Sequence, residues 1–264
     1  MQTSRRLDGR IALVTGASRG IGRATALRLA AEGARIAVNY STDEAGATAT
    51  VRQIEAAGGI ARAVRADVRD TAALETMHGE ITAALGAPDI LVNNAGTLVM
   101  GGALAMEAAA LDEAIDINVA GPLACVQRFV PAMIERRRGR IVNVGATSAF
   151  GTTAAGVVPH AAAKAALLLW GKQLALELGK HGITVNAVCP GAIDTEITLP
   201  GGALHEALKD VRQQQLRNTA LRRAGGMDEV AAVIAFLVSD DAAFVTGQAI
   251  SVDGGRTDFL SRSG

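Results

Sequence analysis

Long apolar segments are missing from this sequence. Residues 1–9 are polar and carry Arg5 and Arg6 with no apolar run behind them, and no stretch of about 18 consecutive apolar residues follows in the chain. Neither a secretion signal nor a membrane span is therefore expected. We expect a cytoplasmic protein with no membrane partner.

Cysteine is also scarce. The 2 cysteines are Cys125, in an expected helix, and Cys189, just after an expected strand. No C-x-x-C pair and no cluster of histidine and cysteine accompanies them, so neither a disulfide framework nor a metal site is expected. We interpret both residues as buried thiols in a reducing compartment.

An excess of charge of either sign is absent, because 26 Lys and Arg residues balance 26 Asp and Glu residues. The densest basic cluster, residues 136–138, lies between an expected helix and an expected strand, where the helix dipole favours positive side chains. We therefore expect no nucleic-acid partner. The expected substrate is a small molecule.

Strand and helix patterns alternate along all 264 residues without a linker-like break. Short apolar runs rich in β-branched residues recur at 11–14, 35–38, 61–65, 89–92, 140–144, 184–188 and 249–252. Segments of helical periodicity lie at 24–32, 44–57, 72–85, 111–136, 161–180 and 228–237. Strands separated by crossover helices are parallel and buried on both faces.

The pattern predicts one α/β domain over residues 1–264, a Rossmann fold with a doubly wound parallel sheet of about seven strands flanked by helices. Ligands of such sheets bind at the carboxyl ends of the strands. The segment 192–223 breaks the alternation, because it is polar, contains glycine and has helical character only in part. We interpret it as a lid over the substrate, with a long surface excursion as the alternative.

A glycine-rich turn follows the first expected strand and opens a helix. It runs from Thr15 to Gly22 and includes Gly16, Ser18, Arg19, Gly20 and Ile21. Glycines at this spacing let the backbone turn sharply and approach a pyrophosphate, whose charge the N–H groups of the helix start favour. The turn predicts a dinucleotide site.

Further motifs follow the glycine-rich turn, and together they make this chain resemble a classical short-chain dehydrogenase/reductase. The motifs are Asp67-Val68, Asn93 to Gly96, Asn118 to Gly121, Pro190 to Thr195 and Val252 to Gly255, in the order and spacing of that family. The resemblance covers nearly the whole chain. It implies that Asp67 and Val68 border an adenine, that Asn94, Ala95 and Gly96 lie along the cofactor, and that Pro190, Gly191 and Thr195 line the nicotinamide site.

The end of the second strand predicts which nicotinamide cofactor binds. An acidic residue there would accept hydrogen bonds from a ribose 2′-hydroxyl, but the sequence has Asn39, Tyr40 and Ser41, with no carboxylate before Asp43. Arg19 can offer a cationic fork to a 2′-phosphate. The expected cofactor is NADP(H).

The expected catalytic group departs from the family pattern. The resemblance implies a serine, a Tyr-x-x-x-Lys pair and an asparagine; Asn118 and Lys164 match, but His160 stands at the tyrosine position. Counting back from His160 places Thr147 at the serine position, whereas counting forward from the strand reaches Ala146, which has no hydroxyl. We favour Thr147, with Ser148 as a further candidate.

A histidine beside a lysine is driven neutral, and a neutral imidazole is a poor proton donor to an alkoxide. We therefore expect an NADPH-dependent oxidoreductase acting on a small carbonyl or imine compound with a non-standard site. The alternatives are a non-redox isomerase, lyase or cyclase that uses His160, and a pseudoenzyme that only binds NADPH. Apolar residues on more than one face of the segments 111–136 and 161–180 predict a homotetramer, or at least a dimer.

Overall fold

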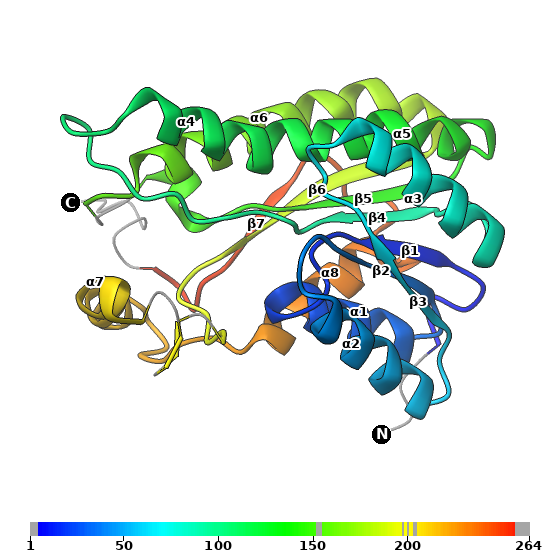
Figure 1. The fold of residues 1–264 in the computed structure, drawn as a ribbon, viewed down its shortest axis with the longest axis horizontal. Helices are drawn as coiled ribbons and strands as arrows, with labels where there is room; N and C mark the ends of the chain where they lie inside the picture. Colours follow the sequence, from blue (N-terminus) through cyan, green and yellow to red (C-terminus); the bar gives the residue numbers. More distant parts are fainter. Residues whose placement is uncertain (1–4, 152–154, 197, 200, 203–204, 257–264) are drawn as a thin grey trace.

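The protein is described here from a computed structural model, which describes residues 5–151, 155–196, 198–199, 201–202 and 205–256. Seven parallel strands form one sheet in the order β3-β2-β1-β4-β5-β6-β7 (Figure 1). The order reverses between β1 and β4, as in a doubly wound sheet. The expected fold class is confirmed.

Each strand coincides closely with an apolar run of the sequence. The strands are β1 (Ile11–Val14), β2 (Arg35–Tyr40), β3 (Ala61–Arg65), β4 (Ile90–Asn93), β5 (Gly139–Val144), β6 (Ile183–Pro190) and β7 (Ala249–Val252). Every residue of β1, β4, β5 and β6 is buried. Burial on both faces explains why these strands are continuously apolar rather than alternating.

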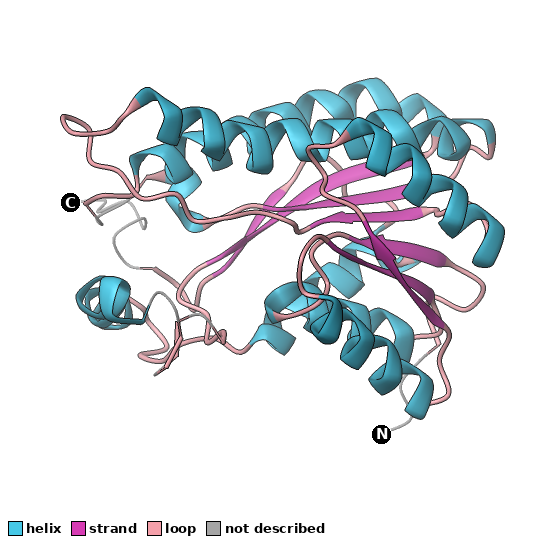
Figure 2. Cartoon of the chain, viewed as in Figure 1, coloured by secondary structure: helices cyan, strands magenta, loops and turns pink. Residues whose placement is uncertain are grey.

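Helices cover both faces of the sheet (Figure 2). The helices are α1 (Gly20–Ala31), α2 (Glu44–Ala56), α3 (Thr71–Ala84), α4 (Ala108–Ile115), α5 (Gly121–Glu135), α6 (Val158–Leu178), α7 (His205–Arg217) and α8 (Met227–Val238). One layer holds α1, α2 and α8, and the opposite layer holds α3, α4, α5 and α6 (Figure 1). An apolar core lies between the sheet and each layer.

The helical segment 111–136 expected from the sequence is composite. It consists of α4, a π-helical turn over Asp116–Ala120 and α5. Contrary to the sequence expectation, the combined segment Ala108–Glu135 is long and apolar enough to cross a membrane by length and composition. Its buried residues, such as Phe129 and Met133, pack in the core beneath α3 and α5. A core helix passes the same composition test, so this segment carries no argument for a membrane span.

The segment expected to be a lid contains a helix whose bounds the sequence did not predict. α7 lies within it, beyond the carboxyl ends of β6 and β7 and outside the two helical layers (Figure 1). Residues 197, 200 and 203–204 of this segment lie outside the described residues. The segment returns to the body through a bridge between Ile193 and Gly225.

Candidate active site

The glycine turn after β1 has the shape that a pyrophosphate site requires. Gly16 has a φ of 62°, in the left-handed region that favours glycine. A Cβ on Gly22 would lie 2.3 Å from the carbonyl oxygen of Gly16, so only glycine fits there. α1 begins at Gly20 with no side-chain cap at Arg19. Its first N–H groups are therefore aimed at the place where a phosphate binds.

Residues after β4 hold this turn in place. The Asn94 side-chain nitrogen donates to the carbonyl oxygens of Thr15 and Gly16 at 2.8 and 3.1 Å. The backbone N–H groups of Asn94 and Ala95 both donate to the Thr15 hydroxyl at 2.9 Å. Two of the motifs identified from the sequence therefore meet across the neighbouring strands β1 and β4.

The ends of β2 and β3 form the far part of the expected cofactor site. Asn39 is buried, and its side-chain nitrogen donates to the carbonyl oxygen of Ala66 at 3.0 Å. Tyr40 is also buried, whereas Ser41 is exposed. The Asn39 side chain therefore points into the protein. Of the three residues, only Ser41 is exposed at the surface after β2.

The Asp67-Val68 motif after β3 has two separate structural roles. Asp67 accepts hydrogen bonds from the guanidinium of Arg69 at 2.6 to 3.2 Å, and these bonds lower the pKa of its carboxyl. Val68 is buried against Gly121, where an added Cβ would lie 2.6 Å from a Val68 methyl group. The motif joins β3 to the start of α5.

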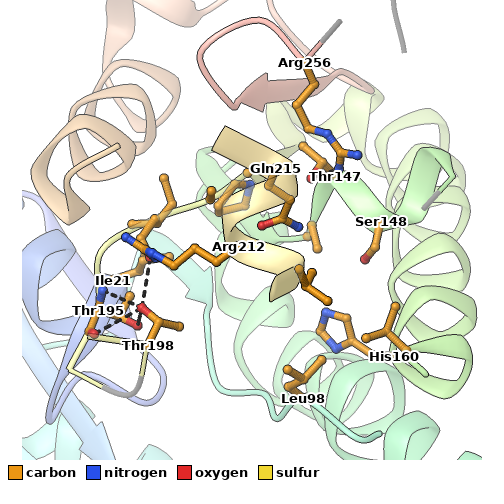
Figure 3. A pocket seen from close by; sticks show the side chains of 18 of the residues that line it. Ile21, Leu98, Thr147, Ser148, His160, Thr195, Thr198, Arg212, Gln215 and Arg256 are labelled. Carbon is orange, nitrogen blue, oxygen red and sulfur yellow. Dashed lines mark hydrogen bonds between the residues drawn. The ribbon is translucent and has the colours of Figure 1, made fainter. Parts of the chain in front are cut away.

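A cavity of about 310 Å³ opens at the carboxyl ends of β5 and β6. Its volume is in the range of small-molecule sites. Figure 3 shows side chains from several elements converging on it. Its lining includes Ile21, Leu98, Thr147, Ser148, Val157, His160, Pro190, Gly191, Ile193, Thr195, Thr198, Arg212, Gln215 and Arg256. Residues expected at the nicotinamide site and at the catalytic site thus share one cavity.

Lys164 and Asn118 lie beside Gly96. The Lys164 ammonium is buried and donates to the carbonyl oxygen of Val144 at 2.8 Å. Burial lowers its pKa to about 8. A Cβ on Gly96 would lie 2.6 Å from Oδ1 of Asn118 and 3.4 Å from Nζ of Lys164, so glycine leaves room for both side chains. Within the described residues, Asn118 Oδ1 is buried without a hydrogen-bond partner.

His160 stands one helical turn before Lys164 on α6 and faces the cavity. Its Nδ1 lies 3.2 Å from the carbonyl oxygen of Thr97. Burial lowers its pKa to about 4, and the charge of Lys164 adds to this effect while the bond to Thr97 opposes it. The ring is therefore neutral near pH 7. The chain has 1 tyrosine, Tyr40 at the end of β2, so no phenol elsewhere replaces one at position 160.

Both hydroxyl candidates line the cavity, with different partners. Arg256 donates to the Thr147 hydroxyl at 3.3 Å. Ser148 Oγ is buried and has no hydrogen-bond partner among the described residues. Ala146, reached by counting from the strand, also lines the cavity. The sequence alternatives are thus adjacent in space, and only Ser148 keeps its hydroxyl unoccupied by protein groups.

The lid contributes polar side chains that sequence reasoning missed. Arg212 and Gln215 of α7 reach the cavity (Figure 3), and Arg212 pairs with Asp194. The Thr195 hydroxyl lies 3.0 Å from that of Thr198. Only the spacing of Arg212 and Gln215 on one helix face could have indicated them. Arg256, beyond the last motif, gave no signal.

The described residues offer neither a metal site nor a reactive thiol. In the described part of the chain, no group of three or more His, Cys, Asp or Glu side chains could hold a metal ion. Cys125 and Cys189 are buried free thiols, and burial raises the pKa of each to about 12. Neither thiol is a reactive nucleophile near neutral pH.

Comparison with known proteins places this site in a family. A family model described as "Enoyl-(Acyl carrier protein) reductase" matches residues 16–257. The 3-oxoacyl-[acyl-carrier-protein] reductase FabG of Staphylococcus aureus is 40% identical over 246 residues, covering 92% of this chain and 96% of the relative.

Solved structures agree. A blue fluorescent protein from a metagenomic library, in complex with NADPH, matches with a TM-score of 0.86 and 38% identity, over 95% of this chain and 98% of that one. A short-chain dehydrogenase of Burkholderia cenocepacia in complex with NADP matches with a TM-score of 0.84 and 38% identity, over 95% and 99%. The fold and site are those of a dinucleotide-binding oxidoreductase. The chain belongs to the short-chain dehydrogenase/reductase family.

Proposed function

We propose that this protein is an NADPH-dependent reductase whose substrate is a small compound with a C=N bond. NADP(H) fits the glycine turn, whose glycines leave room for a pyrophosphate, and Arg19 on that turn can pair with a 2′-phosphate. No carboxylate stands at the end of β2 to repel that phosphate. Relatives solved with NADPH and NADP support the same choice. When bound, the cofactor supplies the hydride.

The observation that carries the substrate class is the state of His160. Reducing a ketone creates an alkoxide that must receive a proton, and a neutral imidazole with a pKa of about 4 is a poor source of that proton. A protonated imine already carries the charge that draws hydride, and its reduction leaves a neutral amine. The FabG relatives are named for a 3-oxoacyl substrate, whose ketone would need the missing acid.

Other residues of this chain would hold and orient the reactants. We assign Lys164 to the nicotinamide ribose hydroxyls, since its ammonium lies beside Gly96 at the inner edge of the site. We assign the role of the family serine to Ser148, whose hydroxyl is unoccupied by protein groups, in preference to Thr147, which Arg256 engages. Asn118 would support the water or hydroxyl that meets its free Oδ1.

The experiment that tests this function measures NADPH consumption against matched panels of ketones and cyclic imines of the same ring size. Turnover of imines with ketones at least about 10-fold slower in kcat/KM supports the proposal. Brisk ketone turnover that persists in His160→Ala would overturn it, because the missing acid would then be irrelevant.

A second function has its own supporting observation. The lone pair of a neutral imidazole that faces a cavity can accept a proton, although a pKa of about 4 makes this ring a weak base, so a lyase, isomerase or cyclase that uses His160 is the competing candidate. NADPH that stays bound without being oxidised, together with substrate conversion, would identify this alternative. Bound NADPH with no conversion of any substrate would indicate a pseudoenzyme.

The assembly that we propose is a homotetramer built around α5 and α6. Leu169 and Leu176 of α6 are 70% and 76% exposed in the single chain, and Leu123 of α5 is 37% exposed. A second copy packed on these helices would bury them. We place the protein in the cytoplasm, where two free thiols and a reduced nicotinamide cofactor are compatible with the surroundings.

A further inference from the structure

The ring of His160 is held in one tautomer by the backbone. Its Nδ1 lies 3.2 Å from the carbonyl oxygen of Thr97, and a carbonyl oxygen can only accept a hydrogen bond. Nδ1 must therefore carry the hydrogen. The same carbonyl accepts from the Asn118 side chain at 3.2 Å, and Asn118 also donates to Ala114 at 3.0 Å. The Thr97 carbonyl is thus held between the π-helical turn and α6.

The other ring nitrogen is consequently a hydrogen-bond acceptor. A neutral imidazole has one N–H, so with the hydrogen on Nδ1 the Nε2 atom carries a lone pair. His160 lines the cavity, and Figure 3 shows one ring nitrogen turned toward it, between Leu98 and Ser148. The lowered pKa of His160 keeps the ring neutral at pH 7. The charge of Lys164, on the same face of α6, opposes the uptake of a second proton.

We propose that Nε2 of His160 selects the substrate by accepting a hydrogen bond from the N–H of a protonated imine. This inference rests on the proposed function and names its substrate class: iminium ions that carry a hydrogen on nitrogen. Hydride adds to the imine carbon, the C=N electron pair moves to nitrogen, and the product is a neutral amine that keeps its N–H. No proton passes to or from His160. A ketone oxygen, which brings no hydrogen, would face the lone pair unfavourably.

The test compares two iminium ions of the same ring: the protonated cyclic imine and its N-methylated counterpart, which has no N–H. A hydrogen bond to a charged partner predicts that the unmodified enzyme prefers the N–H substrate by roughly 10–150-fold in kcat/KM. His160→Phe keeps a ring of similar size but removes the acceptor, so the preference should fall to near one through loss on the N–H substrate alone. His181→Phe, at a histidine far along the chain from the cavity, is the matched control and should keep the preference.

Equal rates for the two ions in the unmodified enzyme, or an unchanged preference in His160→Phe, would overturn the proposal. A structural role alone would lower both rates together. Retained binding of NADPH by His160→Phe, measured by titration, shows that the variant is folded.

A spectroscopic measurement separates this inference from the reaction itself. In protein labelled with ¹⁵N-histidine, the signal lost in His160→Phe should have the shifts of a neutral Nδ1–H ring at pH 7. An Nε2–H or doubly protonated ring would contradict the proposal. If no imine is reduced, the proposed function fails. The hydrogen-bond acceptor Nε2 can then still be tested by letting a cyclic ammonium ion and its N,N-dimethyl form compete for the cavity. Only the first ion carries an N–H, so only the first should bind to Nε2.

Discussion

The side-chain oxygen of Asn39 accepts a hydrogen bond from the backbone N–H of Gly16 at 3.2 Å. This bond joins the end of β2 to the glycine turn after β1, and it explains why Asn39 is buried rather than turned to the surface. Asn39, one residue before the end of β2, therefore helps to shape the glycine turn. We expect discrimination between the two cofactors to depend on Arg19 and on the exposed Ser41.

Arg19→Ala should narrow the preference for NADPH over NADH. A guanidinium bound to a 2′-phosphate contributes on the order of 1–3 kcal/mol, so the ratio of dissociation constants should shrink by roughly 5–150-fold. Arg62→Ala, at an exposed arginine on β3, is the control and should leave the ratio unchanged. Titration of both cofactors by nicotinamide fluorescence measures it. Equal affinities for NADPH and NADH in the unmodified protein would contradict this prediction.

The fold was predictable because burial and sequence pattern coincide. The apolar runs at 11–14, 61–65 and 249–252 match β1, β3 and β7 to the residue. The π-helical turn was not predictable, because Asn118 interrupts a helix whose apolar periodicity continues on both sides. The sequence indicated some helix in the segment 192–223 but not the bounds of α7, because this helix is polar and its contacts with the cavity come from tertiary placement.

For the site, the sequence predicted several residues that line the cavity, but it missed Arg212, Gln215 and Arg256 and could not predict side-chain directions. It named Asn39 as a cofactor residue, and only the structure shows its amide engaged inside the protein. It favoured Thr147 over Ser148, whereas our proposal of Ser148 depends on Arg256, which is far along the chain and outside every motif. The tautomer of His160 depends on a backbone carbonyl at Thr97 that no sequence pattern records.

Replacing exposed leucines on α6 should disrupt the assembly. Leu169→Asp with Leu176→Asp puts charge on a surface that we expect to be buried between subunits, so the tetramer should dissociate to dimers or monomers. Ile60→Asp, at an equally apolar exposed position before β3, should not change the mass. Light scattering at micromolar concentration gives the answer. A monomer before any substitution would contradict the prediction.

His160 should make the protein sensitive to acid. Its folded-state pKa of about 4 lies below its unfolded value of 6.5, so the unfolded chain takes up the proton first as pH falls. Stability from the neutral ring is complete above about pH 6.5 and is lost toward pH 4, by on the order of 1–3 kcal/mol. His160→Phe should lose less of its free energy of unfolding between pH 7 and 4.5. Urea denaturation at one protein concentration, with His181→Phe as control, measures the difference.

Cofactor affinity should fall above about pH 8. Burial lowers the pKa of Lys164 to about 8, and a ribose hydroxyl bound to its ammonium would raise that pKa in the complex. NADPH binding is therefore strongest below pH 8 and weakens as pH rises through it. Lys164→Met should bind NADPH less tightly and show a flatter pH profile, whereas Lys172→Met, on the exposed side of α6, should keep the original profile. The same profile in Lys164→Met would rule out this assignment.

Restoring a phenol at position 160 should restore ketone reduction. In His160→Tyr the pair with Lys164 keeps its spacing of one helical turn, and the nearby ammonium lowers the pKa of the phenol so that it can pass a proton to the developing alkoxide. General acid catalysis contributes about 10²–10⁴-fold, so a rise of at least about 10-fold in ketone kcat/KM is expected.

His160→Ala should show no such gain, which separates the effect of the added acid from that of a smaller side chain. Preference for N–H iminium ions should fall in His160→Tyr, because a phenol donates where Nε2 accepted. Ketone rates that do not change, in a variant that still binds NADPH, would mean that residues other than His160 keep ketones from reacting.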